Sequence, residues 1–134
     1  EKAMIEGRKN GVNPMDNVKP LCDANMLLEM QSKVNNIFVH ESLTDYIINL
    51  VNKTRGHNDL ERGASPRATL AFNAMAKAHA FLAGREYVVP KDIQAVFLPV
   101  ITHRLILTPE AEVNGKNTTE IAKEILASTF VPKV

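Results

Sequence analysis

An arginine beside a predicted helix start is the side chain in this sequence best suited to binding a charged group. Arg67 lies in the stretch RGASPRA, directly after Ser65 and Pro66. Serine favours the N-cap of a helix and proline its first position, so Arg67 is expected in the first turn. Free backbone N–H groups and the helix dipole already make the potential positive there. A guanidinium group at such a helix start is well suited to a phosphate oxygen.

Arg67 also has an interpretation that needs no ligand. A flexible arginine at the surface could reach into solvent or toward Glu61. A cation at an exposed helix start costs only ~0.3–1 kcal/mol, so a folded chain tolerates it easily. Local chemistry taken alone favours this simpler interpretation.

The histidines and the serine do not form a recognisable catalytic or metal site. His40, His57, His79 and His103 are scattered, with no pair three or four residues apart that would present two imidazoles to one metal ion. His79 is expected to be a hydrogen-bonded core residue rather than a catalytic one. Ser65 lacks a GxSxG context, and a capping role accounts for its hydroxyl group. A small hydrolase that uses His79 or His103 is an alternative hypothesis, which metal analysis and a hydrolase screen would test.

The sequence contains no phosphate-binding loop. No stretch fits the pattern GxxxxGK[ST], and the nearest candidate, Gly115-Lys116-Asn117-Thr118, lacks the first glycine and a preceding buried strand. The chain on its own is therefore not expected to bind and hydrolyse ATP, and neither a catalytic residue nor a metal ligand is predicted in it.

Composition indicates one small cytoplasmic domain. A length of 134 residues suits a single domain. The 16 Lys and Arg balance 15 Asp and Glu, and both signs are spread along the chain, which argues against a nucleic-acid or membrane-surface binder. The single cysteine, Cys22, cannot form an internal disulfide, as expected in a reducing cytoplasm. The apolar runs are well short of the ~20 residues of a membrane span.

Helices are expected to position these residues, two of them before RGASPRA. Asp23 can cap a short helix with one apolar face. Ser42 and Asp45 have the spacing of a capping box, and apolar residues follow them at helical intervals. Gly56 is expected to end this second helix.

Three further helices are expected from Ser65 onward. From Ser65 onward an alanine-rich run lets neighbouring helices approach closely, which predicts the central helix, with His79 on its inner face. Pro90 is expected to begin the next helix, and Pro99 to kink or split it. Asn117 is expected to cap the last one.

Short strands are expected at residues 36–40, 86–89 and 104–107, and polar loops at 57–63 and 108–116. The predicted fold is therefore mainly α. It is a small bundle of about five helices with two or three short β-strands.

Separated blocks of the sequence resemble the C-terminal lid domain of the MoxR family of AAA+ ATPases over roughly residues 21–134, in order and in spacing. The blocks are Asp45-Tyr46-Ile47 with Thr54-Arg55, then Gly63-Ala64-Ser65-Pro66-Arg67-Ala68, then Gly84-Arg85-Glu86-Tyr87-Val88, Pro90-Lys91-Asp92-Ile93, and His103-Arg104-Leu105. Val89 departs from the family pattern, since Ser or Thr often caps there, and Lys91 stands where an acid is common. Asp92 partly compensates for the charge of Lys91.

The resemblance implies a lid that packs on a larger α/β nucleotide-binding domain. Residues 1–20 would be the connector or tail of that domain, and residues 21–134 the lid. Arg67 would correspond to the sensor-2 arginine, which points at the γ-phosphate of ATP, with Ser65 as N-cap and Pro66 as first residue of its helix. ATP and Mg²⁺ would be cofactors of the full-length parent, an ATPase, and not of this fragment alone.

The resemblance also implies partners. These are the parent's own large domain, the neighbouring subunits of a ring expected to be a hexamer, and proteins with von Willebrand factor A domains that such chaperone-like ATPases mature or assemble. Nucleic acid is not expected. The alternative is a free-standing helical module that binds protein or DNA, for which the dispersed charges supply no obvious basic face.

Overall fold

The computed structural model describes residues 1–6, 13, 15 and 18–133. These fall into two units, Glu1–Gln31 and Ser32–Val134. Part of the predicted connector or tail, residues 1–20, lies outside the described residues. Within the described part of the chain, no helix is both long enough and apolar enough to cross a membrane.

The first unit contains helix α1 (Lys2–Glu6) and most of helix α2 (Ala24–Asn35). Asp23 caps α2 as predicted, because its Oδ1 accepts a hydrogen bond of 2.7 Å from the Met26 backbone N–H. None of the residues of α2 is buried, although the helix has an apolar face.

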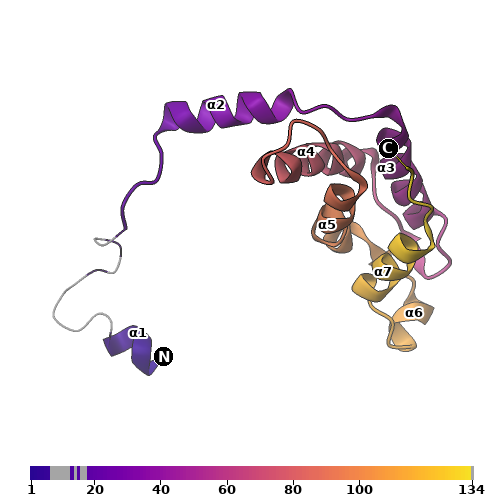
Figure 1. Cartoon of the computed structure of the whole chain (residues 1–134). Coiled ribbons are helices and arrows are strands. Elements are labelled where there is room, and N and C mark those ends of the chain that lie inside the picture. Colours follow the sequence, from indigo (N-terminus) through magenta and orange to yellow (C-terminus); the bar gives the residue numbers. More distant parts are fainter. Residues whose placement is uncertain (7–12, 14, 16–17, 134) are drawn as a thin grey trace. The chain divides into compact units, whose positions relative to one another are not determined.

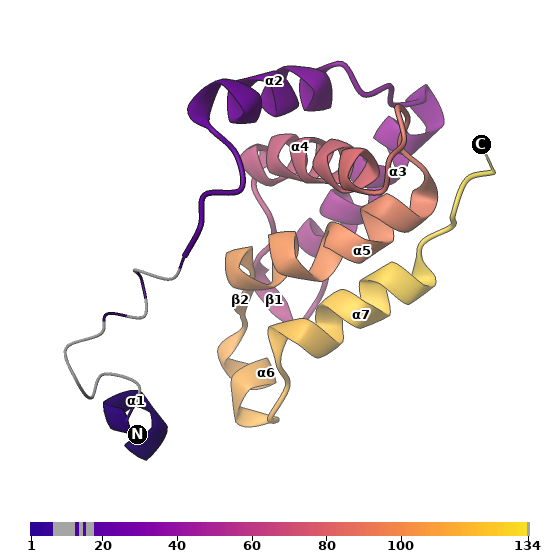
Figure 2. The same cartoon turned by 60° about the vertical axis from the view of Figure 1, so that its left-hand side comes forward.

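The second unit is built from four longer helices, α3 (Glu41–Arg55), α4 (Pro66–Leu82), α5 (Pro90–Ile101) and α7 (Thr118–Ser128). α4 packs most extensively against α5, while α3 and α7 contact each other and close the bundle (Figures 1 and 2). The predicted mainly α fold is confirmed. The core contains the fully buried side chains Leu43, Tyr46, Leu50, Phe72, Ile93 and Phe97.

The close packing predicted for the alanine-rich helix α4 is also confirmed. Its buried residues are small except for one phenylalanine, namely Ala68, Phe72, Ala76 and Ala80. This stripe repeats every four residues, so it lies slightly to one side of the predicted stripe that included His79. Small side chains on this face let α5 approach α4 closely.

Short strands complete the unit, with a pairing that differs from the predicted one. β1 (Leu60–Arg62) pairs antiparallel with β2 (Ile106–Leu107). β2 falls within a predicted strand, but β1 falls in a predicted loop, because a three-residue strand shows no periodicity. The strands predicted at 36–40 and 86–89 shrink to a single parallel bridge between Phe38 and Tyr87.

A short helix, α6 (Pro109–Val113), occupies part of the loop predicted at 108–116. Thr108 caps it, since its hydroxyl accepts a hydrogen bond of 3.2 Å from the Ala111 N–H. Between α5 and β2 lies one turn of 3₁₀ helix, η3 (Thr102–Arg104). Thr108 followed by Pro109 is a helix-start signal. The helix after it was not predicted because it has only five residues, too few to show a helical pattern of apolar residues.

The helix boundaries follow the predictions except at α3 and α5. The predicted Ser42–Asp45 capping box is wrong, because α3 begins two residues earlier and His40 caps it through an Nδ1 that accepts from the Ser42 N–H at 3.2 Å. Asn117 caps α7 as predicted, by accepting from the Glu120 N–H at 2.9 Å. Pro99 does not split α5, since Pro99 is exposed and water can reach the carbonyl group that its ring leaves without a partner.

Candidate functional site

The start of α4 has the backbone geometry that the sequence predicts. Ser65 occupies the N-cap position in an extended conformation, with φ −76° and ψ 167°, and Pro66 is the first helical residue. The predicted cap by the Ser65 hydroxyl is wrong, because this hydroxyl makes no capping hydrogen bond. The Ser65 carbonyl instead accepts a hydrogen bond of 2.8 Å from the Ala68 N–H.

Arg67 lies in the first turn of α4, and its side chain is exposed. Within the described ranges, its guanidinium takes part in no hydrogen bond or ion pair. It reaches into solvent, as one form of the simpler interpretation expects, and the contact with Glu61 is not formed. The first turn carries no acidic side chain that would neutralise it. The helix dipole and the guanidinium therefore both present positive potential to solvent at one point.

The loop before α4 is held against the last turn of α3. The Thr54 hydroxyl is fully buried, donates to the Val51 carbonyl at 2.6 Å and accepts from the Ala64 N–H at 2.9 Å. A Cβ on Gly63 would lie 2.5 Å from the backbone carbon and oxygen of Thr54, so only glycine allows this approach. The loop thus packs backbone to backbone against α3.

Arg55 holds the same loop from the surface. Its Nε donates to the Ala64 carbonyl at 2.8 Å, and its Nη1 donates to the Asn52 side chain at 3.1 Å. Sequence reasoning did not predict the contacts of Thr54 and Arg55 with Ala64, although both residues belong to the blocks that carry the family resemblance. The signal was their position, at a helix end ten residues or fewer before Ala64.

The other end of α4 is tied to α5 through Asp92. The Asp92 side chain is 1 % exposed and accepts hydrogen bonds from Arg85 Nη1 at 2.8 Å and Nη2 at 2.6 Å. His79 Nδ1 lies 2.7 Å from the same carboxylate. The His79 side chain is 44 % exposed, so the predicted hydrogen bond exists but the predicted core position is wrong.

The Asp92 carboxylate is held in its charged form. Burial raises its pKa, but hydrogen bonds from Arg85, the Val89 N–H and His79 outweigh burial and lower the pKa to about 2. The bond from the Val89 N–H, at 2.7 Å, also completes the start of α5. Val89 has no polar side chain with which to cap α5. The Asp92 carboxylate therefore supplies the side-chain hydrogen bond at this helix start.

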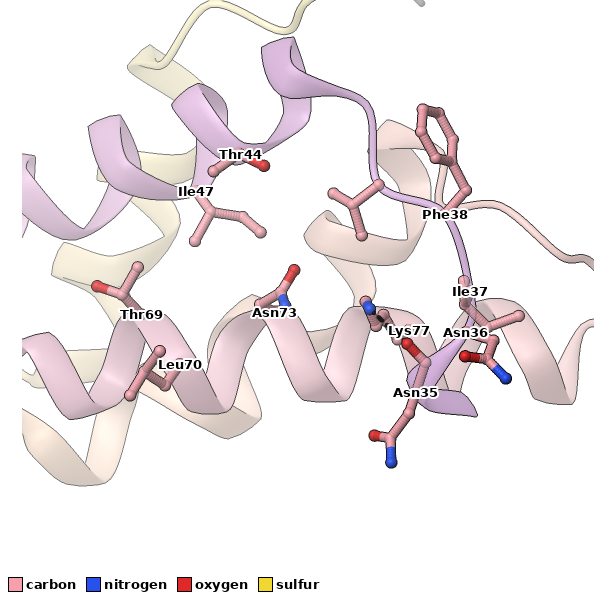
Figure 3. A pocket seen from close by; sticks show the side chains of 11 residues that line it. Asn35, Asn36, Ile37, Phe38, Thr44, Ile47, Thr69, Leu70, Asn73 and Lys77 are labelled. Atoms are coloured by element: carbon pink, nitrogen blue, oxygen red, sulfur yellow. Dashed lines mark hydrogen bonds between the residues drawn. The ribbon is translucent and has the colours of Figure 1, made fainter. Parts of the chain in front are cut away.

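A groove of about 550 Å³ runs along α4 beyond Arg67, between α4, the start of α3 and residues 35–39. Figure 3 shows Thr69 and Asn73 pointing from α4 toward Thr44 and Ile47 of α3. Lys77 closes the far end, where its ammonium donates to the Asn35 carbonyl at 2.9 Å. Leu70, one turn from Arg67, is 73 % exposed at the near end.

The comparison with family models decides the family. The model of the AAA lid domain matches residues 52–125, a range that includes the Thr54–Ala64 contacts, all of α4 and Asp92. The chain belongs to the AAA lid domain family.

Relatives of this lid agree with that assignment. The uncharacterised protein YeaC of Bacillus subtilis (strain 168) is 34% identical over 120 residues, which are 90% of the lid chain and 38% of YeaC. Chaperone MoxR1 of Mycobacterium tuberculosis is 35% identical over 133 residues, or 92% of the lid chain and 35% of MoxR1. The resemblance to MoxR proteins that the sequence blocks predicted is confirmed.

A solved structure has the same fold. The crystal structure of a putative ATPase from Cytophaga hutchinsonii matches with a TM-score of 0.84 and 34% sequence identity, over 99% of the lid chain and 44% of that ATPase. The lid chain thus spans less than half the length of these three proteins.

The last family block, His103-Arg104-Leu105, has a local role in this lid. The Arg104 guanidinium donates to the Val100 carbonyl at the end of α5 and contacts the ring of His103. In the part of the lid that the structure describes, no three side chains of His, Cys, Asp or Glu gather as metal ligands would.

Proposed function

We propose that this lid is the C-terminal part of a MoxR-type AAA+ ATPase and that Arg67 is its sensor-2 arginine. In this role the guanidinium binds the γ-phosphate of ATP held by a separate α/β domain. The observation that carries the proposal is the exposed Arg67 in an uncapped first turn of α4, which carries no acidic side chain. A phosphate there gains both the guanidinium and the helix dipole.

The domain boundaries of the proposal are those that the resemblance implies. Residues 1–20 form the connector or tail of the large domain, and residues 21–134 form the lid. Because relatives are more than twice as long as this chain, there is ample length for a nucleotide-binding domain in the parent protein. The phosphate loop and the ligands of Mg²⁺ would belong to that domain, because no stretch of this sequence fits the phosphate-loop pattern.

The large domain also covers the groove beside Arg67. A domain that brings a phosphate to Arg67 must approach Leu70, which lies one turn further along the same side of α4. Burying this exposed leucine would stabilise the closed arrangement of the two domains by about 1.5–3 kcal/mol. ATP would thus bind lid and large domain together through one charged contact and one apolar contact.

Hydrolysis would then change the angle of the lid. α4 is held at its start by the contacts to Ala64 and at its end by Asp92. Attraction of Arg67 to the γ-phosphate would therefore move the whole helical unit. When the γ-phosphate leaves, Arg67 would lose this contact and the lid could move away from the large domain. In a ring of such subunits this motion would drive chaperone-like maturation of client proteins, with von Willebrand factor A domain proteins as the proposed clients.

The proposal is tested by ATP turnover of the longer protein that carries this lid. Arg67→Ala is expected to lower turnover at least tenfold, because a charge-assisted hydrogen bond to the reacting phosphate is lost. Arg62→Ala, which removes another exposed arginine nearby, is the control and should leave turnover unchanged. Unchanged turnover in Arg67→Ala would reject the sensor-2 role.

A further inference from the structure

We propose that Arg55 is a positioning residue for Arg67. By holding the carbonyl group of Ala64, Arg55 fixes the point at which α4 begins and so the direction in which the Arg67 guanidinium leaves the helix. This inference rests on the proposed sensor-2 role of Arg67 and adds to it a second residue, on a different helix, that acts through Arg67.

The two polar groups of one peptide residue, Ala64, are both held by α3. Its N–H donates to the Thr54 hydroxyl at 2.9 Å, and its carbonyl accepts from Arg55 Nε at 2.8 Å. Neighbouring residues of α3 therefore hold Ala64 from both sides. Only Ser65 and Pro66 separate Ala64 from Arg67.

In the described part of the chain, the hydrogen bonds to Ala64 are those that tie the loop before α4 to α3. The Ser65 hydroxyl makes no capping bond, so the helix start is not fixed by its own N-cap. Pro66 restricts its own φ angle but has no N–H with which to anchor the turn. The Asp92 cluster holds the far end of a 17-residue helix. The hydrogen bonds from α3 to Ala64, together with the burial of Ala68 in the core, therefore set the direction of the first turn.

The form of the Arg55 contact suits positioning. The side chain is exposed, so it contributes little to the apolar core, yet two of its nitrogens are hydrogen-bonded, to Ala64 and to Asn52. A planar guanidinium held at two nitrogens has little freedom to rotate. Replacing the buried Thr54 would leave the Ala64 N–H without its partner, whereas Arg55 can be replaced without opening a cavity.

The test is a double-mutant cycle on ATP turnover in the longer protein, with Arg55→Gln, Arg67→Ala and both together. Arg55→Gln should lower kcat/KM about tenfold, the size expected when one charge-assisted hydrogen bond no longer orients a catalytic contact. In the Arg67→Ala background Arg55→Gln should cause no further loss, because a residue that acts through Arg67 has nothing left to position. Arg62→Gln makes the same change of charge and is expected to have no effect in either background.

Two results would overturn the inference. One is turnover in Arg55→Gln equal to that of Arg62→Gln. The other is an equal fold-loss from Arg55→Gln with and without Arg67, which would mean that Arg55 supports the fold in general or contacts nucleotide itself. The melting temperature of each variant is expected within a few degrees of that of the wild type. This measurement distinguishes a loss of turnover from unfolding of the variant.

Hydrogen exchange distinguishes failure of this inference from failure of the sensor-2 role. In Arg55→Gln the backbone amides of Ala64, Ser65, Arg67 and Ala68 should exchange faster than in Arg62→Gln, whether or not ATP turnover depends on Arg67. Faster exchange together with normal turnover in Arg67→Ala would reject the sensor-2 role, and with it the functional half of the inference. Unchanged exchange would show that Arg55 does not hold the loop before α4, even if Arg67 proves essential for ATP turnover.

Discussion

Arg85 and Asp92 form a two-point contact in which both terminal guanidinium nitrogens bind the carboxylate, at 2.8 and 2.6 Å. The carboxylate is almost completely buried and also accepts from His79 and from the Val89 N–H. One side chain thus joins α4, the turn after it and the first turn of α5. Asp92 is accordingly the polar residue whose loss should harm this fold most.

Asp92→Asn should destabilise the chain by about 3 kcal/mol, since it leaves the Arg85 guanidinium partly buried without its counter-charge. Urea unfolding followed by circular dichroism measures the change. Asp45→Asn removes an exposed carboxylate from α3 and serves as the matched control, with a change below about 0.5 kcal/mol. Equal effects of the two substitutions would contradict the importance assigned to the Arg85 contact.

Acid should weaken the fold through the same group. The pKa of Asp92 is lowered to about 2 in the folded chain, from 3.8. Its contribution to stability is therefore fully present above pH 4 and is lost as the pH falls toward 2, and it amounts to roughly 2 kcal/mol. The free energy of unfolding, measured between pH 5 and 2, should fall less steeply in Asp92→Asn than in the wild type. The same slope in both proteins would show that Asp92 does not titrate in this range.

Gly63→Ala should be much more harmful than Gly84→Ala. At Gly63 the new Cβ would lie 2.5 Å from backbone atoms of Thr54, which cannot rotate away, and we expect a loss of about 3 kcal/mol. At Gly84, where φ is +73°, nothing lies within 4 Å and only backbone strain of about 1 kcal/mol opposes alanine. Melting temperatures of the two variants compare these costs directly. A larger drop for Gly84→Ala would contradict the close contact between the loop and α3.

Phe72→Ala should destabilise the chain by about 3–5 kcal/mol, because the ring is fully buried in the centre of the core. It packs against Phe97, with ring centroids 5.6 Å apart. Leu70→Ala, only two positions away but exposed, should change stability by less than about 0.5 kcal/mol. Urea unfolding of both variants tests which face of α4 is the buried one, and similar losses would contradict the assignment.

Local signals were enough to predict much of this fold from the sequence. Ser65 and Pro66 placed the start of α4, Asn117 placed the start of α7, and the run of alanines indicated the central helix. Each of these signals acts within one or two turns of chain. The cap of α3 was missed because histidine is not among the usual capping residues.

Contacts between distant parts of the chain could not be predicted in the same way. The position of His79 outside the core depends on a small rotation of α4 against α5, which no spacing within α4 specifies. β1 acquires its strand conformation from β2, more than forty residues later. The hydrogen bonds of Thr54 and Arg55 with Ala64 depend on how the loop between α3 and α4 packs on α3. The contact of Arg85 with Asp92 likewise depends on the turn between α4 and α5. The sequence blocks indicated these residues without indicating their partners.

Affinity for ATP compared with ADP tests the sensor-2 role of Arg67 most directly. In the longer protein, Arg67→Ala should weaken binding of a non-hydrolysable ATP analogue on the order of tenfold or more, which is the worth of one or two charge-assisted hydrogen bonds. It should leave ADP binding unchanged, because ADP has no γ-phosphate, and Arg62→Ala should change neither. Equal weakening of both nucleotides, or of neither, would contradict the proposal that Arg67 binds the γ-phosphate.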